Sequence, residues 1–206
     1  MGAREPQFIP VGSGPKVRRI AALSQPPAED GGPGLMWLIG LKSDMVSTKA
    51  EALADWTATR GIGLTRFDYS GHGRSEGRFE EATLSDWLEE STAVFQRLTR
   101  GPQILVGSST GAHVALLLLK HLIETAPDDA RRVRGLVLIA PAWDLTDLMW
   151  SQLPDEARRD IIEKGAWVRP SDYDPAGYVI TRRFIEDGRQ HLLKGTGFDP
   201  GRPVLV

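Results

Sequence analysis

The fold of this chain is decided by the stretch Ile104-Leu105-Val106-Gly107-Ser108-Ser109-Thr110-Gly111-Ala112. An apolar run leads into it, and a long apolar run over residues 110–125 follows it. Between them lies the pattern G-x-S-x-G, in which Gly107 and Gly111 flank Ser109. A strand that turns sharply into a helix needs small residues at these positions, because larger side chains would clash across the turn. The stretch therefore predicts a strand, a tight turn with Ser109 at its tip, and a buried helix.

Ser109 is the predicted nucleophile. Such a turn lifts the serine hydroxyl above the sheet and points the following helix N-terminus at the place where an oxyanion would form. Ser108 is the weaker candidate, because the glycine spacing centres on Ser109. An oxyanion needs two N–H donors, and we expect them from the Thr110 amide and from the Leu41 amide, in the loop after the apolar run 35–39. The alternative is an ordinary strand-to-helix turn that only requires small residues.

Outward from this stretch, short apolar runs alternate with helical patterns. Strands are predicted over residues 17–23, 35–39, 63–67, 103–106, 136–140 and 202–206. Helices are predicted between Ser43 or Asp44 and Gly61, after a Thr83–Asp86 capping box, over residues 110–125, between Pro154 and Gly165, and from Asp174 to about Lys194. This alternation is typical of an α/β fold, a doubly wound and mostly parallel sheet with helices on both faces.

Composition narrows the function classes. The chain has 206 residues, enough for one domain over residues 1–206, and its net charge of −2 gives no basic surface for nucleic acid. It has no cysteine, which excludes disulfides and thiolate metal sites. No segment is apolar enough for a membrane span, and no secretory signal is visible, so we expect a cytoplasmic protein. The sequence gives no indication of its oligomeric state.

The segment Asp68-Tyr69-Ser70-Gly71-His72-Gly73-Arg74-Ser75 matches the D-x-x-G-x-G-x-S turn of α/β-hydrolases. With Gly40-Leu41 and the Ser109 turn, it gives three motifs in the order found in that superfamily. Further similarity to one branch of these enzymes lies in residues 42–45, 48–50, 66–71, 101–109 and 152–154, and in Lys164-Gly165 and Trp167. That branch contains a mitochondrial palmitoyl-protein thioesterase, also described as an acyl-glucuronide esterase, and bacterial relatives. The resemblance implies hydrolysis of a small-molecule ester or thioester with a hydrophobic acyl group through an acyl-enzyme, with no metal and no organic cofactor.

The resemblance also implies where the other triad members belong. In α/β-hydrolases the nucleophile, the acid and the histidine follow one another in that order, after successive strands. Residues 203–206 match the start of the strand before the acid, so the sheet is expected to lack its last strand or strands, and the acid and histidine are expected beyond residue 206. We therefore expect the chain to be inactive by itself. The alternative is a catalytically inactive protein that binds an acyl ligand or a partner.

Residues within the chain are weaker candidates for the missing base and acid. His72 lies in the glycine-rich turn, where a structural or solvent role is expected. His113 lies one helical turn after Ser109 and is expected beside the hydroxyl at best. His121 is farther along the same helix, and His191 is expected to be solvated. Asp144 is expected to be a helix cap or a loop acid.

Residues 143–175 do not resemble a plain strand-to-helix connection and are predicted to form a lid. Large apolar side chains are frequent there, and Trp143, Met149, Trp150 and Trp167 are predicted to line an acyl pocket over Ser109. The alternative is that these side chains only pack the lid onto the domain.

Overall fold

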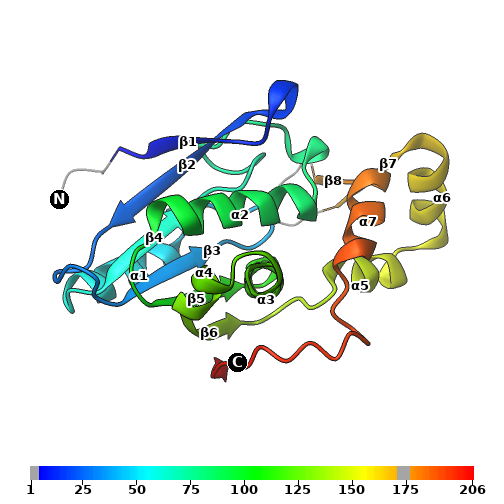
Figure 1. The fold of residues 1–206 in the computed structure, drawn as a ribbon. Coiled ribbons are helices and arrows are strands. Elements are labelled where there is room, and N and C mark those ends of the chain that lie inside the picture. The colour runs from blue at the N-terminus through cyan, green and yellow to red at the C-terminus, as the bar shows by residue number, and fades with distance from the viewer. Residues whose placement is uncertain (1–4, 171–176) are drawn as a thin grey trace.

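The computed structural model of the chain describes residues 5–170 and 177–206 (Figure 1). At its centre is a sheet with the strand order β1-β2-β4-β3-β5-β6-β9. These strands are β1 (Gln7–Val11), β2 (Arg18–Gln25), β3 (Gly34–Leu38), β4 (Gly63–Phe67), β5 (Gln103–Ser108), β6 (Val133–Ile139) and β9 (Val204–Leu205). The strands from β4 to β9 pair in parallel, while β1 and β2 are antiparallel additions at one edge. The predicted mostly parallel α/β fold is confirmed.

Helices cover both faces of the sheet, and in Figure 1 α2 and α3 lie in front of it and α1 behind it. The helices are α1 (Thr48–Ala58), α2 (Leu84–Leu98), α3 (Thr110–Thr125), α4 (Pro127–Arg132), α5 (Leu145–Gln152), α6 (Asp155–Lys164) and α7 (Arg182–Gly188). Short 3-10 turns are η1 (Gly14–Lys16), η2 (Phe79–Glu81) and η3 (Arg189–His191). Every residue of β3 is buried, as expected for a central strand covered on both faces.

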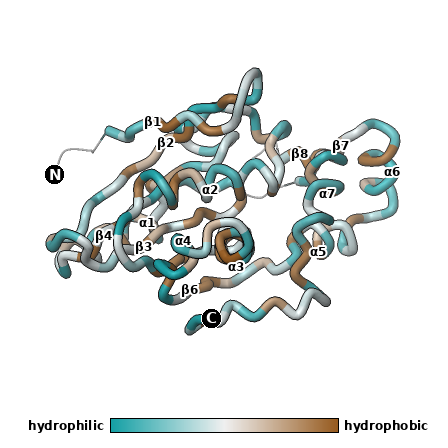
Figure 2. Tube along the Cα trace, viewed as in Figure 1, coloured by the Kyte–Doolittle hydropathy of each residue, from teal (hydrophilic) through white to brown (hydrophobic). Residues whose placement is uncertain are grey.

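The helix α3 is the centre of the core. Its first ten residues are all buried, and Figure 2 shows it as a strongly hydrophobic segment in the middle of the molecule. The neighbouring helix α2 begins with the predicted capping box, in which the Asp86 amide donates to Thr83 Oγ1 and Asp86 Oδ2 accepts from the Thr83 amide. The helix α3, which follows the Ser109 turn, is therefore fixed by burial rather than by exposed polar pairs.

The predicted helix from Asp174 to Lys194 is wrong. Its residues 174–176 lie outside the described residues, and the rest forms a strand, β8 (Tyr178–Thr181), followed by α7 and η3. β8 is antiparallel to β7 (Ala166–Arg169). Side chains that are β-branched or aromatic at four successive positions favour a strand once a partner is available. Thr181 then caps α7, since its hydroxyl oxygen accepts the Phe184 amide at 3.1 Å.

Other boundaries differ less. The first helix begins at Thr48 with Ser47 at its N-cap, not with Ser43 or Asp44. The predicted strand over residues 17–23 is β2, and the strand predicted over 202–206 is the two-residue β9, which pairs in parallel with β6. The sequence did not predict β1, the outermost strand. In the described part of the chain, no helix combines the length and the apolar character needed to cross a membrane.

The lid prediction over residues 143–175 covers α5, α6 and β7, while residues 171–175 lie outside the described residues. These elements gather with β8 and α7 at one end of the molecule, at the right in Figure 1. They follow β6, whose carboxyl end lies beside that of β5 because the two strands are parallel. The segment therefore begins at the same edge of the sheet as the Ser109 turn.

Candidate active site

The turn at Ser109 has the backbone conformation that the sequence predicts. Ser109 has φ 54° and ψ −117°, a sparsely populated conformation that costs about 1–3 kcal/mol for a residue with a side chain. Its amide donates to Ile139 O at 2.9 Å, and its carbonyl accepts from the amides of Ala112 at 3.0 Å and Ala142 at 3.2 Å. These bonds to α3 and to the segment after β6 hold the strained residue in place.

The two glycines of the pattern allow approaches that no side chain would tolerate. A Cβ on Gly107 would lie 2.4 Å from Gly111 O, and a Cβ on Gly111 would lie 2.2 Å from Leu38 O. Both obstacles are backbone atoms, so rotation of a side chain could not relieve either clash. The close packing of β5, α3 and β3 therefore depends on glycine at both positions.

The loop after β3 lies directly against this turn. A Cβ on Gly40 would lie 3.4 Å from Ser109 Cβ and 3.2 Å from Ser108 O. Leu41, the next residue, has an amide that donates to no protein acceptor within the described residues, and the same holds for the Thr110 amide. The two amides predicted as oxyanion donors are thus both unpaired, which leaves their hydrogens available to a ligand.

His72 holds the next residue of this loop. Lys42 has a left-handed φ of 57°, and its amide donates to His72 Nε2 at 3.1 Å. His72 is 5% exposed, and its Nδ1 lies 3.2 Å from Ser70 O. Burial lowers the pKa of His72 to about 4; the bond to the Ser70 carbonyl opposes this shift and the charge of Lys42 adds to it. The ring is therefore neutral at pH 7, and its burial favours the structural over the solvent role.

Asp68, the first residue of the D-x-x-G-x-G-x-S turn, ties three segments together. Its Oδ1 accepts from the Met45 amide at 2.7 Å and its Oδ2 from the Arg74 amide at 2.8 Å. The Ser75 hydroxyl donates to Asp68 O at 2.6 Å. Burial raises the pKa of Asp68, and the two amides oppose that shift. This motif shapes the loops that surround Ser109.

A buried ion pair anchors the same turn to the rest of the fold. Glu90 on α2 is fully buried, pairs with Arg18 on β2, and accepts the Ser70 amide at 2.9 Å. Burial raises the pKa of Glu90, while Arg18 acts in the opposite direction. A buried carboxylate with a charged partner and a backbone donor is a satisfied group, so this pair fixes Ser70 in position.

The other histidines are held by partners of their own. His113 Nδ1 accepts the Asp144 amide at 3.2 Å, so the proton of its neutral ring is on Nε2, which is buried. His191 Nε2 lies 2.7 Å from the Ser85 hydroxyl on α2, so the expectation that His191 is solvated is wrong. His121 lies twelve residues after Ser109 on α3, a rise of about 18 Å.

Asp144 is a loop acid, as one of the two expectations has it. It stands at the N-cap position of α5 with φ 46°, and its side chain makes no cap bond to that helix. Instead Oδ1 accepts from the Leu193 amide at 2.7 Å and Oδ2 from the Lys194 amide at 2.9 Å. Asp144 thereby joins the start of the predicted lid to the chain that leaves α7.

The predicted pocket residues have different environments. Met149 is 5% exposed, Trp143 is 44% exposed, and Trp150 and Trp167 are half-buried. A cavity of about 10 Å³ lies beside Leu41. Among the four predicted pocket residues, Met149 alone lines it. Its other lining residues are Phe79, Tyr178, Val179, Ile180, Thr181 and Phe184. Sequence reasoning missed these residues because most of them belong to the β8 segment, which it assigned to a helix.

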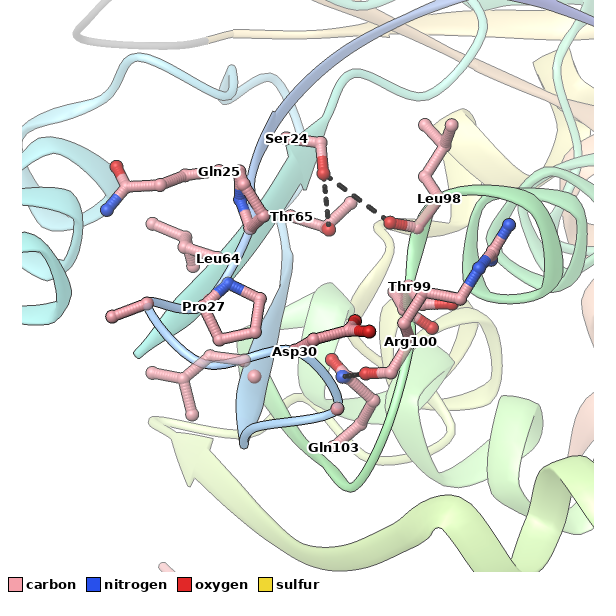
Figure 3. Close-up of a pocket in the computed structure, with 16 residues that line it drawn as sticks. Ser24, Gln25, Pro27, Asp30, Leu64, Thr65, Leu98, Thr99, Arg100 and Gln103 are labelled. Carbon is pink, nitrogen blue, oxygen red and sulfur yellow. Dashed lines mark hydrogen bonds between the residues drawn. The ribbon is translucent and has the colours of Figure 1, made fainter. Parts of the chain in front are cut away.

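A larger hollow of about 360 Å³ lies at the opposite end of the sheet (Figure 3). It is lined where β3, β4 and β5 begin, by Gly34, Gly63 and Gln103 among others. Ligands of open α/β sheets bind outside the carboxyl ends of the strands, where Ser109 lies. This hollow is therefore not part of the candidate site. Across the described residues, no cluster of three His, Asp or Glu side chains could hold a metal ion.

Comparison with known proteins shows the family to which the chain belongs. Residues 44–169 match the family described as serine aminopeptidase, S33. The chain is 36% identical to human mitochondrial palmitoyl-protein thioesterase ABHD10 over 175 residues, which cover 84% of this chain and 55% of that protein. The chain thus spans about 55% of the length of this curated relative. Such relatives are named as mitochondrial, and the cytoplasmic location expected from this sequence stays a prediction.

Solved structures of hydrolases resemble this chain over most of its length. A putative hydrolase from Agrobacterium vitis has a TM-score of 0.92 at 43% identity, covering 97% of this chain and 77% of that one. The α/β-hydrolase domain-containing protein 10 from mouse has a TM-score of 0.81 at 30% identity, covering 98% of this chain and 76% of that one. The likeness therefore extends over nearly the whole chain.

Proposed function

Because the chain belongs to the serine aminopeptidase family of α/β-hydrolases, we propose that it acts on carboxylic esters or thioesters with a hydrophobic acyl group, through an acyl-enzyme on Ser109. The observation that carries this proposal is the Ser109 turn itself. A serine held in a strained conformation with positive φ, with two unpaired amides beside it, supplies the nucleophile and the oxyanion donors of acyl transfer.

The proposed reaction has two steps. Ser109 Oγ attacks the substrate carbonyl carbon, and the carbonyl oxygen becomes an oxyanion that accepts hydrogen bonds from the Leu41 and Thr110 amides. The alcohol or thiol then leaves with a proton, which gives an acyl-serine. Water attacks the acyl-serine in the second step and releases the acid. The helix α3 begins at Thr110, so its N-terminal dipole favours the negative charge in both steps.

The proton of Ser109 requires a base, and none of the four histidines is proposed for that role. A neutral imidazole has one acceptor nitrogen. In His72 that nitrogen accepts the Lys42 amide, and in His113 it accepts the Asp144 amide. Because both acceptor nitrogens are already bonded, neither ring can take the Ser109 proton. This favours a second candidate function for the chain, which is binding of an acyl ligand in the same site without turnover.

The acyl group is proposed to lie between the Leu41 loop and the lid. Trp143, Met149, Trp150 and Trp167 remain the proposed pocket residues, and the cavity beside Leu41 supports the place of Met149 among them. The palmitoyl-protein thioesterase activity named for the relatives supports a long acyl chain. A cavity of about 10 Å³ holds no such chain, so binding requires that the lid elements move apart.

A fluorophosphonate probe, which phosphonylates activated serines, tests both candidates. If a base activates Ser109 in this chain, labelling should be lost in Ser109→Ala and kept in Ser108→Ala, a buried neighbour that serves as the matched control. Turnover of p-nitrophenyl esters of increasing acyl length then measures substrate preference. Binding of a long-chain acyl ligand with no labelling would support the second candidate, and labelling that survives Ser109→Ala would refute Ser109 as the nucleophile.

A further inference from the structure

The loop that carries the Leu41 amide contains a strained residue, Lys42, which another interaction must stabilise. Lys42 has a φ of 57°, a conformation that costs about 1–2 kcal/mol for a residue with a side chain. Without a restraint, the Lys42 peptide would relax toward a right-handed or extended conformation. The neighbouring Leu41 amide would then change direction, because the two peptides share the Leu41 Cα. The direction of this unpaired N–H therefore depends on what holds Lys42.

The restraint is a hydrogen bond to a buried ring. The Lys42 amide donates to His72 Nε2 at 3.1 Å, and His72 is 5% exposed. Because a backbone amide can only donate, Nε2 must be unprotonated and the proton must be on Nδ1. Nδ1 lies 3.2 Å from Ser70 O, which accepts that proton. The imidazole thus transmits the fixed position of the Ser70 peptide to the Lys42 peptide.

The ring itself has no freedom to turn away. It packs edge-on against Tyr69, Phe79 and Trp87, with ring centroids 5.9, 5.4 and 5.3 Å away. Trp87 Nε1 also donates to Ser70 O at 3.3 Å. On the loop side, the Lys42 ammonium lies 4.4 Å from the centre of the Phe79 ring. A ring enclosed in this way fixes both of its hydrogen-bond partners.

The Ser70 peptide is anchored in turn. Its amide donates to Glu90 Oε2 at 2.9 Å, and Glu90 pairs with Arg18 on β2. A continuous set of polar contacts therefore leads from the buried ion pair, through Ser70 and His72, to the loop that carries Leu41. The last contact, between His72 and Lys42, joins this network to the candidate oxyanion hole.

We propose that His72 is a positioning residue of the oxyanion hole, which accepts the Lys42 N–H and thereby fixes the direction of the Leu41 N–H. It acts through the loop and touches no reacting atom. The inference rests on the proposed function, in which Ser109 is the nucleophile and Leu41 is an oxyanion donor. It gives the histidine of the G-H-G sequence a role in the reaction that differs from that of a general base.

The role requires the neutral ring. A protonated imidazole has two donors and no acceptor, so Nε2–H would face the Lys42 N–H. The charged or titratable groups nearest the ring are the Lys42 ammonium, the Tyr69 phenol and, beyond Ser70, the Glu90 carboxylate. Burial, together with the Lys42 charge, keeps the pKa of His72 at about 4. The hydrogen bond is therefore present at neutral pH and is lost as the pH falls through about 4.

The test compares His72→Phe with His72→Gln in fluorophosphonate labelling at pH 7. Phe keeps the aromatic packing and removes the acceptor, whereas Gln offers an oxygen at the position of Nε2. We expect His72→Phe to lower the maximal labelling rate, kinact, by about 10²-fold, the size of effect that a misplaced catalytic group produces. The probe concentration at half-maximal rate, KI, should stay the same, and His72→Gln should recover most of kinact. A role in folding alone would lower the labelled fraction and the melting temperature, not the rate per folded molecule.

Each possible failure has a separate meaning. An unchanged kinact in a folded His72→Phe protein overturns the inference and leaves the function intact. A wild-type chain that does not label, or labelling that persists in Ser109→Ala, overturns the proposed function and the inference with it. If His72→Phe does not fold, imidazole 15N shifts of the wild type decide instead. A proton on Nδ1, with the Lys42 amide proton titrating together with the ring near pH 4, supports the inference, and a proton on Nε2 overturns it.

Discussion

The Ser109 turn and the lid segment start from the same edge of the sheet, yet they are held in place by different forces. In the turn, backbone atoms of β3, β5 and α3 approach one another more closely than a single Cβ would allow. In the lid, the Asp144 carboxylate at the start of α5 accepts two backbone amides of the chain that follows α7. Contacts between backbone atoms fix the turn, whereas side chains hold the lid, through Asp144 and through buried apolar residues such as Met149 and Phe184.

This difference suits the two regions to different tasks. A nucleophile must keep its position to within a fraction of an ångström, and contacts between backbone atoms supply that rigidity. A lid over an acyl pocket must open, and segments held by side-chain contacts open at a lower cost in free energy than a turn held by backbone contacts on all sides. Mutations that act on one kind of contact should therefore affect the two regions unequally.

The largest expected effect is that of Gly111→Ala in the turn. The new methyl group would lie 2.2 Å from Leu38 O, and relief requires that α3 move away from β3 in the core. We expect a loss of more than about 4 kcal/mol in the free energy of unfolding, or a protein that does not fold. The measurement is denaturant unfolding followed by circular dichroism.

The matched control for this change is Gly165→Ala at the end of α6. Gly165 has a φ of 86°, and no atom lies within 4 Å of the place that an alanine methyl group would take. Alanine there meets only the left-handed penalty of about 1–2 kcal/mol. Equal losses in the two variants would mean that steric contact does not distinguish the turn from the lid.

The same contrast explains what the sequence predicted. Gly107 meets Gly111, which is close in the sequence, and Gly111 meets the neighbouring strand β3. Contacts of this kind leave a pattern in the sequence, so the turn and the α/β fold were predicted and are confirmed. The β7–β8 hairpin was not predicted, because Tyr178–Thr181 forms a strand only by pairing with Ala166–Arg169. The bond between His72 and Lys42 was not predicted either, since it joins residues thirty positions apart and no spacing rule indicates it.

Asp144→Ala should have the next largest effect, and it should be confined to the lid. The change removes the acceptor for the Leu193 and Lys194 amides, which are bonded at 2.7 and 2.9 Å. Hydrogen bonds to a charged group contribute about 1.5–3 kcal/mol, so we expect a local loss of about 2 kcal/mol. Hydrogen exchange at these two amides should accelerate, while exchange in α3 stays slow. Asp147→Ala, an exposed acid in the same helix, is the control, and equal acceleration in both variants would contradict a specific role of Asp144.

A smaller effect is expected from pH, through His113. This side chain lies on α3, one turn after Ser109, and its Nδ1 accepts the Asp144 amide, so it joins the two regions. Burial lowers the pKa of His113 below its usual 6.5, and the Asp144 charge opposes the shift. The unfolded chain therefore takes up the proton first, and stability that is present above pH 6.5 is lost as the pH falls below it.

His113→Asn isolates this contribution, because its oxygen can accept the same amide without titrating. A hydrogen bond of this kind contributes about 1 kcal/mol. We expect the variant to lose less stability than the wild type between pH 7 and pH 5, measured by denaturant unfolding with tryptophan fluorescence. The pKa of His72 is also lowered by burial, but His72 is present in each protein and cancels in the difference, whereas the charge of His191 contributes to the lowered pKa of His113 and is part of the effect measured. Identical pH profiles would show that folding does not lower the pKa of His113.

The smallest change in stability is expected from Trp143→Ala, which tests whether the lid also binds the acyl chain. Trp143 is 44% exposed and Trp56 on α1 is 45% exposed, so the two truncations remove similar side chains from similar environments. Both should change the free energy of unfolding by less than about 0.5 kcal/mol, as surface substitutions usually do. If Trp143 lines the proposed pocket, its loss should raise KI for a fluorophosphonate with a long alkyl chain by about fivefold, equal to about 1 kcal/mol of apolar contact. A short-chain probe should be unaffected, and Trp56→Ala should change neither value. An unchanged KI for the long chain in Trp143→Ala would leave this tryptophan with a packing role alone, and would place the acyl chain against Met149 and the β8 side of the lid.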